Sequence, residues 1–215
     1  MTITEKENSL FDEWRKNREG FVSDGLVDET SYLKSGLKLM FVLKEVNDPD
    51  GGDWDLRQFV REGGRPRTWD NITRWVKGIR SLPSEVRWNE LSEITEVQRR
   101  DTLTSICAIN LKKSPGGHTT DNQSLWEVSN KDREFIRRQF AFYNADIVIG
   151  CGTTDLLYSL VDFGSNPVWL MTTRGVWYHE YFPKKFVISY AHPEARVAGY
   201  LLYYGLIDAL REILS

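Results

Sequence analysis

KLMFVLKEVNDPDGGDW, residues 38–54, is the stretch from which we infer the fold. It begins with an apolar run, Leu39 to Leu43, that is too short for a helix and is soon followed by Asn, Asp, Pro and Gly. This pattern is typical of a strand buried on both faces of a parallel sheet. Open α/β sheets bind ligands beyond the carboxyl ends of their strands. The polar residues 44–52 are therefore interpreted either as a functional loop or as a solvated turn.

Further apolar runs predict more strands of the same sheet. Buried strands are expected at 104–111, 145–152 and 186–190, an edge strand at 176–182, and a strand or connector at 168–172. Helical spacing or caps predict helices at about 5–18, 28–33, 56–61, 68–81, 84–92, 95–103, 132–143, from 153 or 154 onward, and 197–214. Right-handed crossovers then give a three-layer α/β/α sandwich around a central, mainly parallel sheet of about four strands. Residues 1–36 are expected to form an N-terminal helical extension packed on this unit.

Composition sets limits on the class of protein. The chain has 215 residues and a formal net charge of -3, so any nucleic-acid contact needs a local basic patch. Cys107 and Cys151 lie in or beside apolar runs, where a reduced and buried thiol is expected. The sequence shows no signal-peptide pattern and no apolar run long enough to span a membrane. We expect a cytoplasmic monomer with no membrane contact.

Two further strand ends carry side chains that suit chemistry. Asn110 ends the predicted strand at 104–111, and its amide offers a donor and an acceptor together, as reading a nucleobase edge requires. The alternative is an Asn that ties the loop to its own backbone. His192 follows the strand at 186–190 and suits stabilisation of negative charge on an oxygen, or a purely structural role.

Other polar segments carry less specific signals. His118 and His179 have no partners at metal-ligand spacing, and the glycine pairs at 63–64 and 116–117 do not form a phosphate-binding GxxxxGK[ST] loop. We therefore expect no metal and no cofactor. The only local basic concentration consists of Arg65, Arg67, Arg74, Lys77, Arg80, Lys112 and Lys113. A solvated helix face is the usual explanation for such a run.

Four segments follow one another in an informative order: LKEVNDP at 43–49, INLKKSPGG at 109–117, DIVIGCG at 146–152 and AHPEAR at 191–196. This order resembles the uracil-DNA glycosylase superfamily. There the first loop is similar to GxDPY, GxNPG or GEAPG, an Asn ends the second strand, a later strand ends in glycine, and the last loop carries HPS. The resemblance covers about residues 39–214 and implies a single uracil-DNA glycosylase-like domain over 1–215.

The resemblance implies catalytic roles at the matching positions. Glu45 stands where GEAPG has its Glu, whereas Asp48 matches the Asp of GxDPY only after a shift of two residues. Asn47 is the third candidate for orienting water. His192 matches the histidine that contacts the base oxygen.

The resemblance also implies binding roles. Asn110 matches the asparagine that reads the pyrimidine, and Trp69 or Trp54 would supply the aromatic platform for the base. Phosphate contacts would come from basic residues near these loops, namely Arg65, Arg67, Lys112, Lys113 and Arg196. The cysteines of the iron–sulfur branches are absent, which agrees with an expected lack of cofactor.

The implied activity is hydrolysis of the N-glycosidic bond of a uracil-like or deaminated base in DNA, as in base excision repair. The base would be flipped from a duplex or presented on a single strand. Lys44 replaces the first glycine of the motif, and this change together with the net acidity favours an alternative, a catalytically inactive nucleotide- or DNA-binding module of the same fold. A second alternative is an unrelated α/β hydrolase acting on nucleotides.

Overall fold

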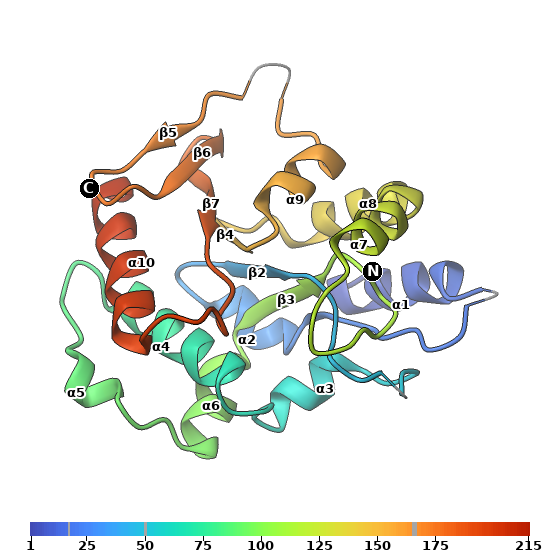
Figure 1. Ribbon diagram of the computed structural model, residues 1–215, viewed down its shortest axis with the longest axis horizontal. Coiled ribbons are helices and arrows are strands. Elements are labelled where there is room, and N and C mark those ends of the chain that lie inside the picture. The colour runs from blue at the N-terminus through green and yellow to red at the C-terminus, as the bar shows by residue number, and fades with distance from the viewer. Residues whose placement is uncertain (17, 50, 165–166) are drawn as a thin grey trace.

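A computed structural model describes residues 1–16, 18–49, 51–164 and 167–215. Within these ranges the strands form one seven-stranded sheet in the order β1-β3-β2-β4-β7-β6-β5, covered by helices on both faces (Figure 1). The strands are β1 (Gly25–Leu26), β2 (Leu39–Leu43), β3 (Ile106–Asn110), β4 (Ile147–Cys151), β5 (Leu170–Met171), β6 (Trp177–Phe182) and β7 (Lys185–Tyr190). Asp50, which belongs to the predicted functional loop, lies outside the described residues.

The four strands at the centre of the sheet are parallel, and each coincides with a predicted buried strand. β2 lies between β3 and β4, with Leu39 opposite both Ile106 and Ile147, and β7 pairs with the far side of β4. The expected total of about four strands is wrong, because β1, β5 and β6 extend the sheet by antiparallel pairing. The segment 176–182 is also not an edge, because β5 covers it.

The helices follow the predicted ranges with two differences. α7 is absent from the sequence prediction, and the helix expected at 84–92 shrinks to the single turn of α5. The helices in the described residues are α1 (Ile3–Trp14), α2 (Glu29–Lys34), α3 (Leu56–Arg61), α4 (Thr68–Ser81), α5 (Trp88–Leu91), α6 (Glu96–Leu103), α7 (Asn122–Lys131), α8 (Arg133–Tyr143), α9 (Thr154–Leu160) and α10 (Gly199–Ile213).

Alternation along β2 divides the core into two halves. Leu39, Phe41 and Leu43 face the side covered by α3, α4, α6 and α10, where the Trp75 ring stacks on Phe41. Met40 and Val42 face the side covered by α1, α2, α7, α8 and α9. This two-sided burial explains why the strand is apolar without interruption. No helix in the described ranges is both long and apolar enough to cross a membrane.

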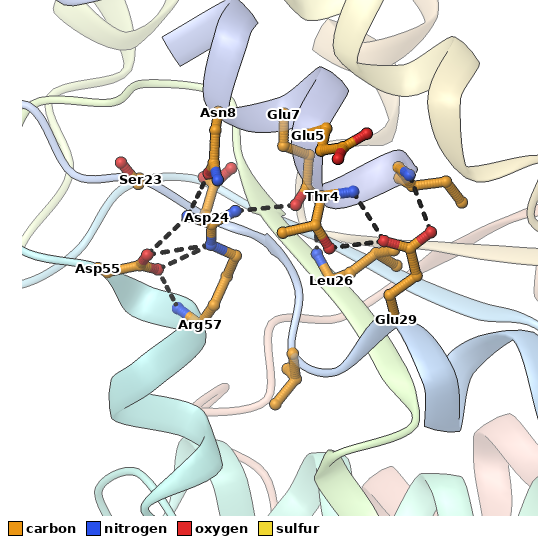
Figure 2. A network of polar contacts seen from close by, with 12 residues as sticks. Thr4, Glu5, Glu7, Asn8, Ser23, Asp24, Leu26, Glu29, Asp55 and Arg57 are labelled. Atoms are coloured by element: carbon orange, nitrogen blue, oxygen red, sulfur yellow. Dashed lines mark hydrogen bonds and ion pairs between the residues drawn. The ribbon is translucent and has the colours of Figure 1, made fainter. Parts of the chain in front are cut away.

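The N-terminal segment contributes a strand, β1, to the sheet. Residues 1–36 are therefore not only the helical extension that was predicted. β1 pairs antiparallel with β3, placing Gly25 opposite Ala108. A buried carboxylate of α1 secures this strand, because Glu7 accepts the Leu26 N–H at 2.9 Å and the Arg57 guanidinium at 2.8 Å (Figure 2). A two-residue strand has no periodicity, so sequence patterns do not reveal it.

Candidate functional site

A cavity of about 440 Å³ opens at the carboxyl ends of the parallel strands. Loops after β2, β3 and β7 contribute polar walls, and α3 and α4 contribute aromatic ones. Eight predicted site residues line it: Glu45, Asn47, Asp48, Trp54, Arg65, Trp69, Asn110 and His192. The fold therefore gathers side chains from positions 45–192 into one site, as expected at the carboxyl edge of an α/β sheet.

The loops after β2 and β3 stay paired beyond the strands. Leu111 N–H donates to Leu43 C=O and Lys112 N–H to Lys44 C=O, each at 3.0 Å. Farther along, Gly116 N–H donates to Val46 C=O at 2.8 Å. This continued ladder fixes the loop at 44–48 on the rigid centre of the sheet.

Glu45 contributes an almost fully enclosed carboxylate to the cavity wall. Its side chain is 4% exposed, and its Oε2 accepts a hydrogen bond from the Lys112 ammonium. Gly116 allows this approach, because a Cβ there would lie 2.3 Å from the Glu45 carboxyl carbon. The ion pair occupies Oε2 and leaves Oε1 without a hydrogen-bond donor in the described part of the chain.

The other two candidates in the first loop are bound to side chains of the cavity rim. Asp48 Oδ2 accepts the Trp54 indole N–H at 2.9 Å, which ties two predicted site residues together. The Asn47 amide lies 3.1 Å from His118 Nδ1. This contact ties the first loop to the loop after β3. His118 also lines the cavity, although its sequence pattern predicted no role for it. Its position in the loop after β3 was the available signal.

Asn110 presents its side chain at the base of the cavity. The residue is 3% exposed, and its side-chain amide has no hydrogen-bond partner among the described residues. Its backbone N–H and C=O are bound by Asp24 and Lys113 at 2.7 and 2.9 Å. The amide is therefore free to bind a ligand. The alternative role, in which the Asn110 side chain ties the loop to its own backbone, is not observed in the structure.

His192 faces the cavity as a hydrogen-bond donor. Burial lowers the pKa of the His192 imidazole, with Lys44 acting in the same direction and Glu194 against it. The ring is therefore neutral at pH 7, and Nδ1 accepts the Glu194 backbone N–H at 3.1 Å. The remaining proton sits on Nε2. α4 holds this loop, because Asn71 Nδ2 donates to Pro193 C=O at 2.7 Å.

Two tryptophans contribute apolar walls. Trp69, on α4, is 4% exposed, and Gly64 packs against its indole so closely that a Cβ there would lie 2.3 Å from Trp69 Cδ1. Trp54 is half-buried and packs against Phe59 with ring centroids 5.6 Å apart. Either indole can stack on a planar ligand.

The predicted phosphate-contacting residues divide into three groups. Arg65, Arg67 and Arg196 are exposed, and Arg65 lies at the cavity. Lys112 is engaged with Glu45. The assignment of Lys113 to DNA contact is wrong, because its side chain is 1% exposed and its ammonium binds Asp24 with both carboxylate distances at 2.7 Å. An ammonium enclosed in this way cannot reach a phosphate.

A second cavity, of about 520 Å³, lies between the N-terminal segment and α3. Its arginines already have protein partners: Arg57 binds Glu7, Asp55 and Asn8 (Figure 2), and Arg61 donates to Val27 C=O. Protein groups therefore already bind the guanidinium groups of this cavity, and the positions of Arg57 and Arg61 need no ligand to account for them. The cavity at the carboxyl edge of the sheet is therefore the candidate functional site.

Comparisons with known proteins assign no family to the chain. A scan against protein-family models finds no match, and a search of curated proteins finds no significant match. The resemblance to the uracil-DNA glycosylase superfamily stays a prediction based on the motifs. The cavity geometry is therefore the basis for a functional proposal.

Proposed function

We propose that this protein is a DNA glycosylase that hydrolyses the N-glycosidic bond of a uracil-like or deaminated base. The observation that carries the proposal is the convergence of three groups on one cavity: the Glu45 carboxylate, the Asn110 amide and the neutral His192 ring. Glycosidic hydrolysis passes through a sugar with oxocarbenium character and needs groups for both developing charges. These three side chains meet that need.

Each group has a distinct role in the proposed reaction. Water attacks the anomeric carbon, the bond to the base nitrogen breaks, and the bonding electrons leave with the base. Glu45 orients the water through Oε1, accepts its proton and stabilises the positive sugar. His192 donates from Nε2 to the base oxygen on which negative charge develops. Asn110 hydrogen-bonds the edge of the base and thereby selects it.

We assign the water-orienting role to Glu45 among the three candidates of the first loop. Asp48 is bound to Trp54, and Asn47 lacks a carboxylate and is bound to His118. The base stacks on Trp69 or Trp54, and the exposed Arg65, Arg67 and Arg196 contact phosphates. So few cations give weak, salt-sensitive binding to DNA.

One observation favours a second candidate, a module that binds a base or nucleotide without cleaving it. The Lys112 ammonium is paired with the Glu45 carboxylate. The pair occupies one of the two carboxylate oxygens that could bind the attacking water, while base recognition by Asn110 does not depend on Glu45.

The deciding experiment measures base release from labelled single- and double-stranded oligonucleotides that contain uracil, hypoxanthine, xanthine or an alkylated base. Wild type is compared with Glu45→Gln and His192→Ala, and with Glu93→Gln, an exposed carboxylate outside the cavity, as the control. We expect a loss on the order of 10²–10³-fold in His192→Ala and a comparable or larger loss in Glu45→Gln, with Glu93→Gln unchanged.

Three other outcomes have defined meanings. Binding of a base-containing oligonucleotide without release from any substrate would favour the binding module. Release that survives the combined change of Asn110→Ala and His192→Ala would point to an unrelated hydrolase. Neither binding nor release by folded wild type would refute both proposals.

A further inference from the structure

A fully enclosed ion pair lies directly behind Asn110. The Lys113 and Asp24 side chains are 1% and 0% exposed, and the ammonium lies 2.7 Å from each carboxylate oxygen. The same ammonium donates to Asn110 C=O at 2.9 Å, and Asp24 Oδ2 accepts Asn110 N–H at 2.7 Å. Both backbone polar groups of Asn110 are thus held by one ion pair.

The sheet geometry explains why these groups need side-chain partners. Successive residues of a strand direct their backbone polar groups to opposite sides, and Leu111 N–H binds Leu43 on β2. Those of Asn110 therefore point the other way, toward β1. β1 covers only Cys107 and Ala108 of β3, so its ladder stops short of Asn110. Asp24 and Lys113 replace the missing strand.

Further contacts fix the ion pair itself. Gln139 on α8 donates to Asp24 Oδ1 at 2.7 Å, and the Trp14 ring lies 4.9 Å from the Lys113 ammonium. Asp24 directly precedes β1, which Glu7 and Arg57 anchor (Figure 2). The position of the pair is therefore set by contacts from α1, α8 and the segment before β1, as well as by the loop that carries Lys113.

A purely structural ion pair would not need this location. Burying two charges costs several kcal/mol per ion, in order of magnitude, and an apolar pair of similar volume often gives equal stability. Reading a base edge, in contrast, requires an amide held within about 0.5 Å. The buried pair supplies that restraint at the one residue of β3 whose side chain faces the cavity as a free amide.

We propose that Asp24 and Lys113 are positioning residues that set the Asn110 amide for base recognition and so determine base selectivity. The part of this inference that concerns base selectivity rests on the proposed function, because it requires that Asn110 binds the edge of a base. Neither residue touches the ligand. A displacement of about 1 Å at a reading group costs on the order of 10²-fold.

The test combines Asp24→Asn with Asn110→Ala in a double-mutant cycle. Binding and release are measured on single-stranded oligonucleotides in pairs that differ only by deamination, uracil against cytosine and hypoxanthine against adenine. We expect Asp24→Asn to reduce the preference for the deaminated base by on the order of 10²-fold, and to have no further effect in the Asn110→Ala background. Equal losses for both bases, or effects that add in the double variant, would overturn the proposal.

A second readout separates failure of the inference from failure of the proposed function. The side-chain amide NMR signals of Asn110 are compared in wild type, Asp24→Asn and Asp132→Asn, the last a matched control whose carboxylate is 0% exposed and paired with Arg18. We expect a shift or broadening in Asp24→Asn alone. If wild type binds no base, the proposed function fails, and these signals still decide positioning: unchanged signals, or equal changes in both variants, refute it.

A milder variant covers the case in which Asp24→Asn does not fold. Gln139→Leu removes one donor to Asp24 and keeps both charges of the pair. We expect a smaller change of the Asn110 amide signals in the same direction. Unchanged signals in a folded Gln139→Leu protein count against the support described above.

Discussion

Replacing Lys113 by methionine tests whether this lysine is a buried structural cation or a DNA contact. The substitution keeps most of the side-chain volume and removes the ammonium, which makes two contacts of 2.7 Å to Asp24 and one of 2.9 Å to Asn110 C=O. The Asp24 carboxylate, 0% exposed, is left as an uncompensated charge beside the Asn110 and Gln139 donors.

The expected loss of stability follows from this burial. Removing one partner of a buried pair costs about 3–5 kcal/mol, because the remaining charge stays enclosed. In a chain of this size the loss lowers Tm by roughly 6–20 °C. Adding Asp24→Asn removes the second charge as well, so the double variant is expected to recover at least about 1 kcal/mol.

Urea unfolding followed by fluorescence gives the midpoint and slope for each variant. Lys131→Met, at an exposed lysine, serves as the control and is expected to change stability by less than about 0.5 kcal/mol. A loss below about 1 kcal/mol in Lys113→Met, or a double variant no more stable than the single, would refute the reasoning. A phosphate-contacting lysine would instead change the salt dependence of DNA binding and leave unfolding unaffected.

Three further predictions concern the support of the site. Burial raises the pKa of Glu7 to about 7, so its contribution to stability is complete below about pH 4.5 and is lost as pH rises to about 7, by up to about 3 kcal/mol. In urea unfolding measured across this pH range, Glu7→Gln is expected to abolish this dependence of stability on pH. An unchanged dependence in the variant would contradict the prediction. Gly52→Ala is expected to cost about 1–3 kcal/mol, because Gly52 has φ +127° and a Cβ would lie 2.4 Å from Gly20 Cα. Gly117→Ala, where a Cβ meets nothing within 4 Å, is the matched control, and equal stabilities would exclude the close approach. Burial lowers the pKa of His192, so its NMR titration is expected to have a midpoint below 6.5, and a midpoint at or above this value would contradict a buried neutral donor.

The core of the fold was predictable from local patterns. LMFVL, IVIGC and the first four residues of ICAIN contain no polar side chain except the Cys thiols, because each strand is covered by helices on both faces. β1 was not predictable in the same way, since two residues cannot establish alternation. β5 lies within 168–172, the segment expected to be a strand or a connector. α7 was not predicted, because most of its residues are polar or charged and only Leu125 and Ser129 are buried, which gives no apolar helical spacing.

The gathering of site residues also followed from sequence position. Glu45, Asn110 and His192 each lie at or just beyond the carboxyl end of a parallel strand, and these ends meet at one edge of the sheet. The hydrogen-bond partners of Glu45, Asp48 and His192 did not follow from sequence position. Lys112, Trp54 and Glu194 are brought to them by the geometry of the loops. Sequence alone left three candidates for the water-orienting role, and their different partners are the basis for preferring Glu45.

The adjacent lysines Lys112 and Lys113 mark the limit of what sequence determines. Both continue the strand that ends at Asn110, and sequence alone assigns them the same solvated or phosphate-binding role. In the folded protein one ammonium reaches Glu45 at the cavity and the other enters the core. The charge of the buried Lys113 is compensated by Asp24, a carboxylate 89 residues away in the sequence. The sequence by itself determined the parallel strands and the residues at their ends; only the tertiary structure decided which charges are exposed and which are enclosed, because that depends on partners brought together by folding.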